Sequence, residues 1–326
     1  MDYGTVLEYH RPSNLPLASE VMEEALVRKW VMFFGDGQYV YGRNWATLVR
    51  LLQVELVRRA QLIGFDEWIL PRYIPRRAFD SFKLTQFAPD LLLSAGPNAC
   101  LDPVQCISFY EHLRGTVLTS KELPIRVVEV MGGWTWRNET LEALDGPFRA
   151  KEFLRVEHVF CGTPEQVKQS RRDTRKSITG LLTELGLGWQ IVVGKGCMDL
   201  PSLTQRRLGA LVADDIPVQD IEIPIRRALH KLPDLPTPGT TTHGILEGNR
   251  IVETASDADY WDHDEICGCS VEGDHLTTDF GILDESGQPL WSGCCGIGLN
   301  RLVLGLLYQH GFEAAERVVR DAISKL

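Results

Sequence analysis

The alternation of apolar and polar positions predicts amphipathic helices on either side of a set of strands. Residues 44–63 repeat apolar side chains at helical spacing, with Asn44 as a suitable N-cap and Gly64 as a suitable end. A second helix is expected from Thr163 to about Leu185. Thr163 begins the sequence TPEQ, which has the residues of a capping box and a proline at the first helical position.

Strands are predicted around these helices. Residues 126–137 and 152–160 are expected to be extended, the second with nearly strict alternation. Residues 189–194 and 291–298 are also expected to be strands, the latter followed by a helix with leucines on its buried side. The stretch 67–75 carries two prolines, which suits a sheet edge or a subunit contact. The pattern favours an α+β fold, a mostly antiparallel sheet with helices packed on it.

Composition places the 326-residue chain among globular proteins. Apolar residues make up 44% and charged residues 24%, and no apolar run approaches the ~18–20 residues that span a bilayer. The first ten residues lack the basic and apolar regions of a secretory signal, so we expect a cytoplasmic protein with no membrane partner. The net charge of −10 argues against a broadly basic surface for nucleic acid.

The eight cysteines include no CxxC pair, and without an export signal we do not expect a disulfide framework. A buried free thiol is the simplest interpretation of any one of them. A metal or catalytic role needs partners that only the fold can bring together. The cysteines are Cys100, Cys106, Cys161, Cys197, Cys267, Cys269, Cys294 and Cys295.

Two segments carry candidate nucleotide-binding side chains, and the first surrounds a predicted turn. Arg137 and Glu139 precede this turn, and Arg149 and Phe153 follow it. An arginine fork suits a phosphate, a glutamate can accept a hydrogen bond from an exocyclic amine, and a phenylalanine can stack on a purine. A surface hairpin with scattered charges is the alternative interpretation.

The second segment is GIGLNR, residues 296–301. Its glycines allow the backbone to approach a ligand closely, and Arg301 at the head of a helix can reach a phosphate. It is not a P-loop, because no Gly-Lys-Ser/Thr follows. It is not a dinucleotide fingerprint either, because no βαβ unit follows.

Together these segments resemble the class II aminoacyl-tRNA synthetase core. GFDEWILPRYIP (64–75) resembles motif 1, WTWRNE…FRAKEFLRVEHVF (134–160) motif 2, and GCCGIGLNRLVLGLL (293–307) motif 3. The phrases GGWTWRNE, KEFLRVEHV and LWSGCCGIGLNR are similar to those of the zinc-dependent seryl-tRNA synthetases of methanogens. EICGCS (265–270) is similar to the seryl-type EISSCS. The resemblance implies a homodimer with a catalytic domain over residues 41–326 after an extension of residues 1–40.

The resemblance implies an ATP site in and after motif 2. Arg137 would bind the α-phosphate and Glu139 the adenine amine, with Arg149 also at the nucleotide. Phe153 and Arg301 would enclose the adenine from two sides, and Arg301 would also touch the γ-phosphate.

It also implies a magnesium site. Glu265 would hold Mg²⁺ on the phosphates, with Ser270 close by. Arg137, Arg301 and Glu265 would then carry the reaction by positioning and charge neutralisation. Val271 stands where seryl enzymes often have asparagine, which implies the loss of a polar contact to serine.

Finally, the resemblance implies one Zn²⁺ per subunit, held by Cys106, Glu157 and Cys294. Cys294 is preferred to Cys295, because adjacent residues of a strand point to opposite faces. Three protein ligands leave one zinc position open, where the α-amino group of an amino acid could replace water. A closed structural zinc, or no metal, is the alternative.

The implied function is activation of a small amino acid as an adenylate, with glycine, alanine, serine and cysteine all open. We expect transfer to the phosphopantetheine thiol of a carrier protein, because at most about 40 residues precede the core and amino acid–[carrier protein] ligases have no tRNA-binding domain. Residues 200–245 could dock that partner. The alternatives are a seryl-type enzyme that charges tRNA, a ligase with a small-molecule or peptide acceptor, and a silent regulatory paralogue.

Overall fold

The computed structural model describes residues 4–12, 20–129, 134–194, 213–225, 244–247, 250–253 and 262–324. Its central nine-stranded sheet consists of β1 (Val6–His10), β4 (Asp66–Trp68), β8 (Ile125–Glu129), β9 (Trp134–Trp136), β10 (Glu152–Gly162), β11 (Trp189–Val193), β12 (Val218–Ile225), β15 (Asp262–Gly273) and β17 (Trp291–Gly298). The strand order is β1-β11-β12-β15-β17-β10-β8-β4, with β9 paired to β10 beside this path. Among the described strands of this sheet, only β4 and β8 pair in parallel, so the predicted α+β fold with a mostly antiparallel sheet is confirmed.

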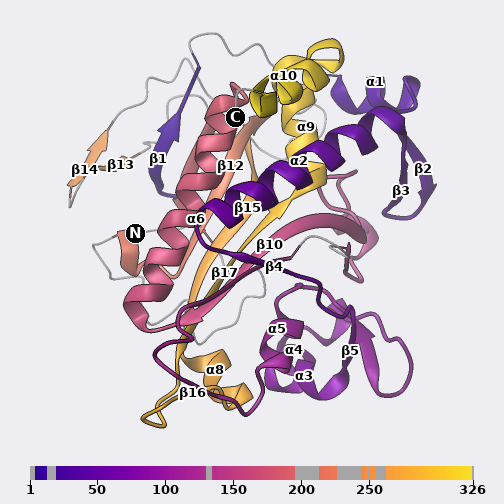
Figure 1. Ribbon diagram of the computed structural model, residues 1–326. Coiled ribbons are helices and arrows are strands. Elements are labelled where there is room, and N and C mark those ends of the chain that lie inside the picture. The colour runs from indigo at the N-terminus through magenta and orange to yellow at the C-terminus, as the bar shows by residue number, and fades with distance from the viewer. Residues whose placement is uncertain are drawn as a thin grey trace.

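Helices pack on both faces of this sheet (Figure 1). The main hydrophobic core lies on one face under α2 (Arg43–Leu62), α6 (Pro164–Glu184) and α9 (Leu299–His310), and α10 (Phe312–Ser324) packs on α2 and α9. A second core lies on the other face, under the short helices α3 (Arg76–Ser81), α4 (Leu84–Phe87), α5 (Ile107–His112) and α8 (His275–Phe280). The face with the short helices carries the candidate site.

The remaining elements are short. They are α1 (Val21–Val27), β2 (Val31–Gly35), β3 (Gln38–Tyr41), β5 (Tyr73–Pro75), η1 (Pro89–Leu91), β6 (Ala99–Leu101), β7 (Val117–Leu118), η2 (Leu141–Ala143), η3 (Ala213–Asp215), β13 (Gly244–Glu247), β14 (Arg250–Glu253) and β16 (Leu283–Asp284). None of the helices in the described part of the chain has the length and apolarity needed to cross a membrane.

The two long helices begin and end close to where local chemistry predicts. α6 has the complete capping box: the Thr163 side chain accepts from Gln166 N, and the Gln166 side chain accepts from Thr163 N. α2 ends before Gly64, whose φ of +84° is accessible to glycine. The predicted N-cap of α2 was wrong by two residues, because Gly42 in extended conformation caps the helix and Asn44 lies inside it.

Alternation along β10 decides which side chains face the candidate site. Val156, His158 and Phe160 point into or against the main core on one face. Glu157 and Val159 point to the opposite face, where Val159 belongs to the second core. The predicted alternation of residues 152–160 is therefore confirmed.

The expected division of the chain at about residue 40 stays a prediction. Within residues 1–40, β1 pairs with β11 at one end of the central sheet. Of the proposed docking segment 200–245, residues 213–225 form η3 and β12. The other residues up to 243, and Cys197, lie outside the described residues.

Candidate active site

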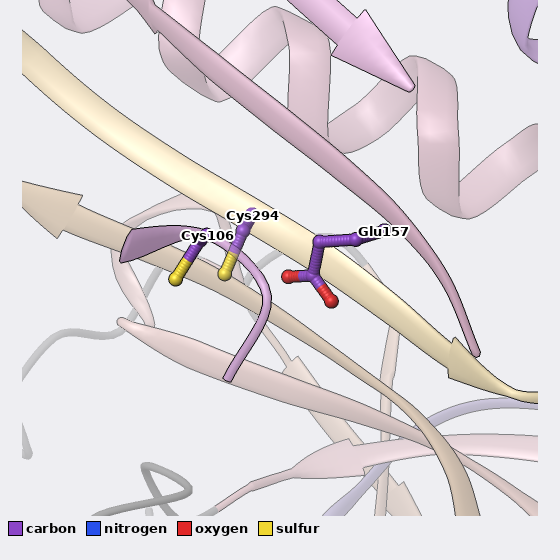
Figure 2. Close-up of side chains that lie close together, drawn as sticks. All are labelled: Cys106, Glu157 and Cys294. Atoms are coloured by element: carbon purple, nitrogen blue, oxygen red, sulfur yellow. The ribbon is translucent and has the colours of Figure 1, made fainter. Parts of the chain in front are cut away.

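Three residues that are far apart in the sequence meet on the face of the sheet that carries the short helices. Cys106, Glu157 and Cys294 each place one ligand atom within 4.8 Å of those of the other two. Figure 2 shows the two thiols and the carboxylate converging from separate backbone segments. Cys106 and Glu157 are buried and Cys294 is partly exposed, so this triplet is largely shielded from solvent.

Strand register and one glycine explain this meeting. β10 and β17 pair so that Glu157 lies opposite Gly296 and Val159 lies opposite Cys294. Cys294 and Gly296 are two residues apart and share a face of the sheet. A Cβ built at Gly296 would overlap Oε2 of Glu157, so the carboxylate occupies space that only glycine leaves open. Cys106 completes the triplet from the residue immediately before α5.

The donor atoms of the triplet suit a thiophilic divalent cation. Burial raises the pKa of the Glu157 carboxyl, and the Arg155 guanidinium opposes this with Nε 3.2 Å from Oε2. The pKa of Cys294 is raised by its hydrogen bond with Cys106, by burial and by the Glu157 charge. Oε2 of Glu157 is buried and accepts no hydrogen bond from the described residues. Two thiols and this carboxylate fit Zn²⁺, which prefers such ligands.

The neighbouring residues on each strand face the other way. Cys295 is buried in the main core together with Cys267 and Cys269. Nδ1 of His158 lies 3.2 Å from the Cys295 carbonyl oxygen, and burial lowers the pKa of His158 to about 4. The structure thus places Cys294, and not Cys295, beside Glu157. Metal binding by this cysteine stays a prediction.

Arg137 and Phe153 lie together next to the triplet. Nε of Arg137 donates a 3.0 Å hydrogen bond to the carbonyl of Pro103, in the loop that leads to Cys106. Its guanidinium carbon stands 5.5 Å from the centre of the Phe153 ring, and that of Arg155 stands 5.8 Å from the same ring. An aromatic face flanked by two cations suits a purine nucleotide with its phosphates. The roles predicted for Arg137 and Phe153 on ATP are not tested by this placement.

Glu139 and Arg149 form an ion pair across the loop between β9 and β10. Nη2 and Nε of Arg149 donate to Oε2 of Glu139 at 2.9 and 3.2 Å. Glu139 is buried, whereas the Arg149 side chain is 53% exposed. The pair therefore holds the loop while leaving Arg149 open to solvent, where a ligand phosphate could reach it.

Arg301 connects this loop to β15. From the first turn of α9, its Nε donates to the Phe148 carbonyl at 2.7 Å and its Nη1 donates to the Glu265 carbonyl at 2.6 Å. Nη1 also lies 3.4 Å from Oε2 of Glu265, whose side chain is 45% exposed. Arg301 and Glu265, two residues predicted to act on ATP and Mg²⁺, are thus direct neighbours.

Ser270 touches the triplet, and Val271 does not. Oγ of Ser270 lies 3.3 Å from Sγ of Cys294, because the two residues are paired across β15 and β17. Val271 belongs to the main core on the opposite face, whereas Cys294 packs against the second core. Alternation turns the Val271 side chain away from the triplet, and the loss of a polar contact to serine stays a prediction.

The family to which this chain belongs can be stated from its match to known proteins. Residues 94–310 match the family described as tRNA synthetase class II core domain (G, H, P, S and T). The chain belongs to this class II synthetase family. The matched range runs from before β6 to the end of α9 and contains the whole candidate site. The fold expected from the three sequence motifs is confirmed.

Relatives of this synthetase core include Type-2 serine–tRNA ligases. The ligase of Methanopyrus kandleri is 30% identical over 351 residues, which cover 96% of the chain and 61% of the relative. That of Methanothermobacter thermautotrophicus is 26% identical over 345 residues, covering 95% and 60%. The chain thus spans about three fifths of the length of these relatives. They give no support to the expected carrier-protein acceptor and fit the tRNA alternative better.

Solved structures agree with the fold of this synthetase core. M. kandleri SerRS, in complex with A. aeolicus tRNASec, has a TM-score of 0.77 and 27% identity, and the match covers 100% of this chain and 64% of that one. The seryl-tRNA synthetase of Pyrococcus horikoshii, complexed with ATP, has a TM-score of 0.67 and 18% identity, with 98% and 64% covered. The second likeness shows the fold alone.

The sequence did not point to a set of buried and partly buried charged and polar residues behind the triplet. They connect motif 1 of the synthetase core, the loop before α5 and the strands β8 and β10 through hydrogen bonds and ion pairs. One signal was available: Arg155 is two residues from Glu157 on β10 and therefore shares its face. These residues, here called the supporting network, are Arg72, Asp102, Gln105, Glu129 and Arg155.

Proposed function

We propose that this synthetase core activates a small amino acid with ATP, forming an aminoacyl-adenylate and pyrophosphate. The meeting of Cys106, Glu157 and Cys294 next to the Arg137–Phe153 pair carries this proposal. On this proposal, a thiophilic metal site would lie beside an aromatic and cationic nucleotide site in one class II core. Serine is the first candidate among glycine, alanine, serine and cysteine, because the relatives described above are serine–tRNA ligases.

Cys106, Glu157 and Cys294 would hold one Zn²⁺ per subunit. When bound there, zinc supplies an open coordination position for the neutral α-amino group of the amino acid. Glu157 and the two thiols would orient the amino acid, because their fixed positions decide where that open position points. Ser270, 3.3 Å from Sγ of Cys294, would lie beside the bound amino acid and its metal ligands.

The charged residues would carry the adenylation step. The amino-acid carboxylate attacks the α-phosphorus, the bond to the β-phosphate bridging oxygen breaks, and pyrophosphate leaves. Arg137 and Arg301 would neutralise charge on the phosphates while Glu265 holds Mg²⁺. Phe153 would stack on the adenine. Glu139 would accept from its amine, and Arg149 would contact phosphate from the solvent side of the loop.

We propose tRNA as the acceptor of the activated amino acid, in place of the carrier protein first expected. The serine–tRNA ligases related to the chain support this acceptor, and so does the likeness to SerRS in its complex with tRNASec. A homodimer in the cytoplasm is part of the same proposal. The chain spans about three fifths of those relatives, so its own acceptor has to be measured.

The test is amino-acid-dependent exchange of pyrophosphate into ATP, measured for all twenty amino acids with the zinc-loaded chain. We expect exchange with serine or another of the four small amino acids. No exchange with any amino acid would overturn the proposal and leave a silent regulatory protein. Labelled amino acid is then offered to tRNA and to a carrier protein that bears phosphopantetheine. Label on tRNA supports the proposed acceptor, and label on the carrier protein alone would overturn it.

A further inference from the structure

The loop that presents Cys106 has an unusual backbone held by one carboxylate. Oδ1 of Asp102 accepts hydrogen bonds from Val104 N at 3.0 Å and from Gln105 N at 2.8 Å. Gln105 has a φ of +69°, in the left-handed region that costs a residue with a Cβ about 1 kcal/mol or more. Gln105 is also 1% exposed. Such a conformation persists only where the surroundings determine it, and it places Cys106 next in the chain.

The Gln105 side chain extends from this loop to the other ligands. Its Nε2 donates to the Glu129 carboxylate, and its Oε1 accepts a 3.1 Å hydrogen bond from Nε of Arg155. The same Nε lies 3.2 Å from Oε2 of Glu157. Gln105 is therefore joined to one proposed metal ligand by a peptide bond and to a second through a single guanidinium.

A rigid base supports Gln105 from behind. Nη1 of Arg72 donates to Asp102 at 2.7 Å, and Nη2 donates to the Glu129 carboxylate. Asp102 and Glu129 are both completely buried. Glu129 lies directly opposite Glu157 in the pairing of β8 and β10, so the base and the proposed metal ligand share one row of the sheet.

We propose that Gln105 is a positioning residue that sets the geometry of Cys106 and Glu157 for the metal. Its backbone conformation directs the Cys106 thiol toward Glu157 and Cys294. Its Oε1 accepts from Nε of Arg155 and so fixes the guanidinium beside Oε2 of Glu157, the buried oxygen that the metal would use. Without this acceptor, the guanidinium loses its fixed position, turns more of its donors onto Glu157 and competes with the cation. The inference rests on the proposed zinc site and adds the residue that arranges it.

Two variants separate the side chain of Gln105 from its backbone. Gln105→Gly accepts the positive φ freely and lacks the side chain. Gln105→Asn also tolerates this φ but is too short to reach both Glu129 and Arg155. Gln309→Asn is the matched control, because Gln309 is also buried and makes hydrogen bonds with Gly188 N and Pro224 O on the other side of the sheet.

The measurement is zinc affinity by chelator competition, together with the sulfur-to-metal charge-transfer spectrum of the Co²⁺-substituted chains. We expect both Gln105 variants to bind zinc about tenfold to a hundredfold more weakly than the unaltered chain and to show an altered Co²⁺ spectrum. Gln309→Asn should change neither, even if it unfolds at lower temperature.

The outcomes separate this inference from the proposal on which it rests. If the unaltered chain binds zinc and the folded Gln105 variants match it within twofold, the positioning role is overturned and the zinc site stands. If the unaltered chain binds no zinc, the proposed function is overturned as well. If Gln105→Gly does not fold, Gln105→Asn decides by the same two readouts.

Discussion

At the scale of single residues, the candidate site depends on the lack of a Cβ at Gly296 as much as on the side chains of its neighbours. The Glu157 carboxylate lies in the space that a Cβ at Gly296 would fill. A side chain there would compete with the buried oxygen that fits a metal. This glycine thus connects the backbone of β17 to the chemistry proposed for the triplet.

We therefore predict that Gly296→Ala lowers zinc content, because the new methyl group displaces the Glu157 carboxylate. Atomic emission on the purified chain measures the metal per subunit. Gly180→Ala is the control, since its Cβ would come no closer than 3.8 Å to the Arg59 guanidinium and alanine suits the interior of α6. Equal zinc in the Gly296→Ala chain and the unaltered chain would contradict this interpretation of the glycine.

Because His158 is buried on the opposite face of β10, we expect the folded protein to lose stability at acid pH. Burial lowers its folded pKa to about 4 from an unfolded value near 6.5. Between these values the unfolded chain binds more protons, so stability falls as the pH falls below 6.5. By this linkage the free energy of unfolding should drop by about 2 kcal/mol more between pH 7 and pH 5 than it does in His158→Gln. Urea unfolding at both pH values measures the difference, and equal drops would contradict the prediction.

At the scale of elements, local chemistry predicted helix α6 and strand β10, whereas long-range contacts were beyond reach. The TPEQ sequence contains its own partners three residues apart, and the alternation of β10 needs no other strand. Arg72 and Glu129 are 57 residues apart, and nothing local marks their pairing. The left-handed Gln105 was equally invisible, because its conformation is imposed by Asp102 and the buried side chains around it.

The capping box of α6 gives a prediction at this scale. Thr163→Ala should lower the free energy of unfolding by about 1 kcal/mol, since Gln166 N loses its acceptor at the start of the helix. Thr163→Ser keeps the hydroxyl and should stay close to the unaltered chain. Denaturant unfolding of the three proteins tests this, and equal stability of the alanine and serine variants would count against the cap.

At the scale of the whole molecule, the sequence predicted the class of the fold and brought the three triplet residues to notice through their resemblance to a family. The distance between Glu157 and Cys294 along the chain does not show that they are neighbours. The pairing of β10 with β17 in the folded sheet brings them together. The same alternation that brings Cys294 to Glu157 removes Val271 from the site. The amino acid could not be predicted from these residues, because the size of its pocket depends on side-chain directions that the sequence does not give. The chain spans about three fifths of the length of its relatives, so the acceptor has to be measured.

The edge of the sheet at β4 indicates that the chain forms a homodimer. β4 ends the strand order, and α2 contacts it. Apolar side chains are in solvent here: Leu62, the last residue of α2, is 71% exposed, and Ile69, the residue after β4, is 69% exposed. We expect this edge to be covered by a second copy of the chain. Ile69→Asp should shift sedimentation from dimer to monomer, whereas Phe34→Asp, at an equally exposed position of β2, should not. A monomeric unaltered chain would contradict the homodimer.

The central claim is that Cys106, Glu157 and Cys294 hold one zinc ion that the reaction requires. Zinc per chain, measured by atomic emission on Cys294→Ala and on its neighbour Cys295→Ala, tests it most directly. The two substitutions are chemically identical and one residue apart, yet they lie on opposite faces of β17. We predict about one zinc in the unaltered chain and in Cys295→Ala, and none in Cys294→Ala. Equal zinc in both variants, or loss only in Cys295→Ala, would contradict the claim.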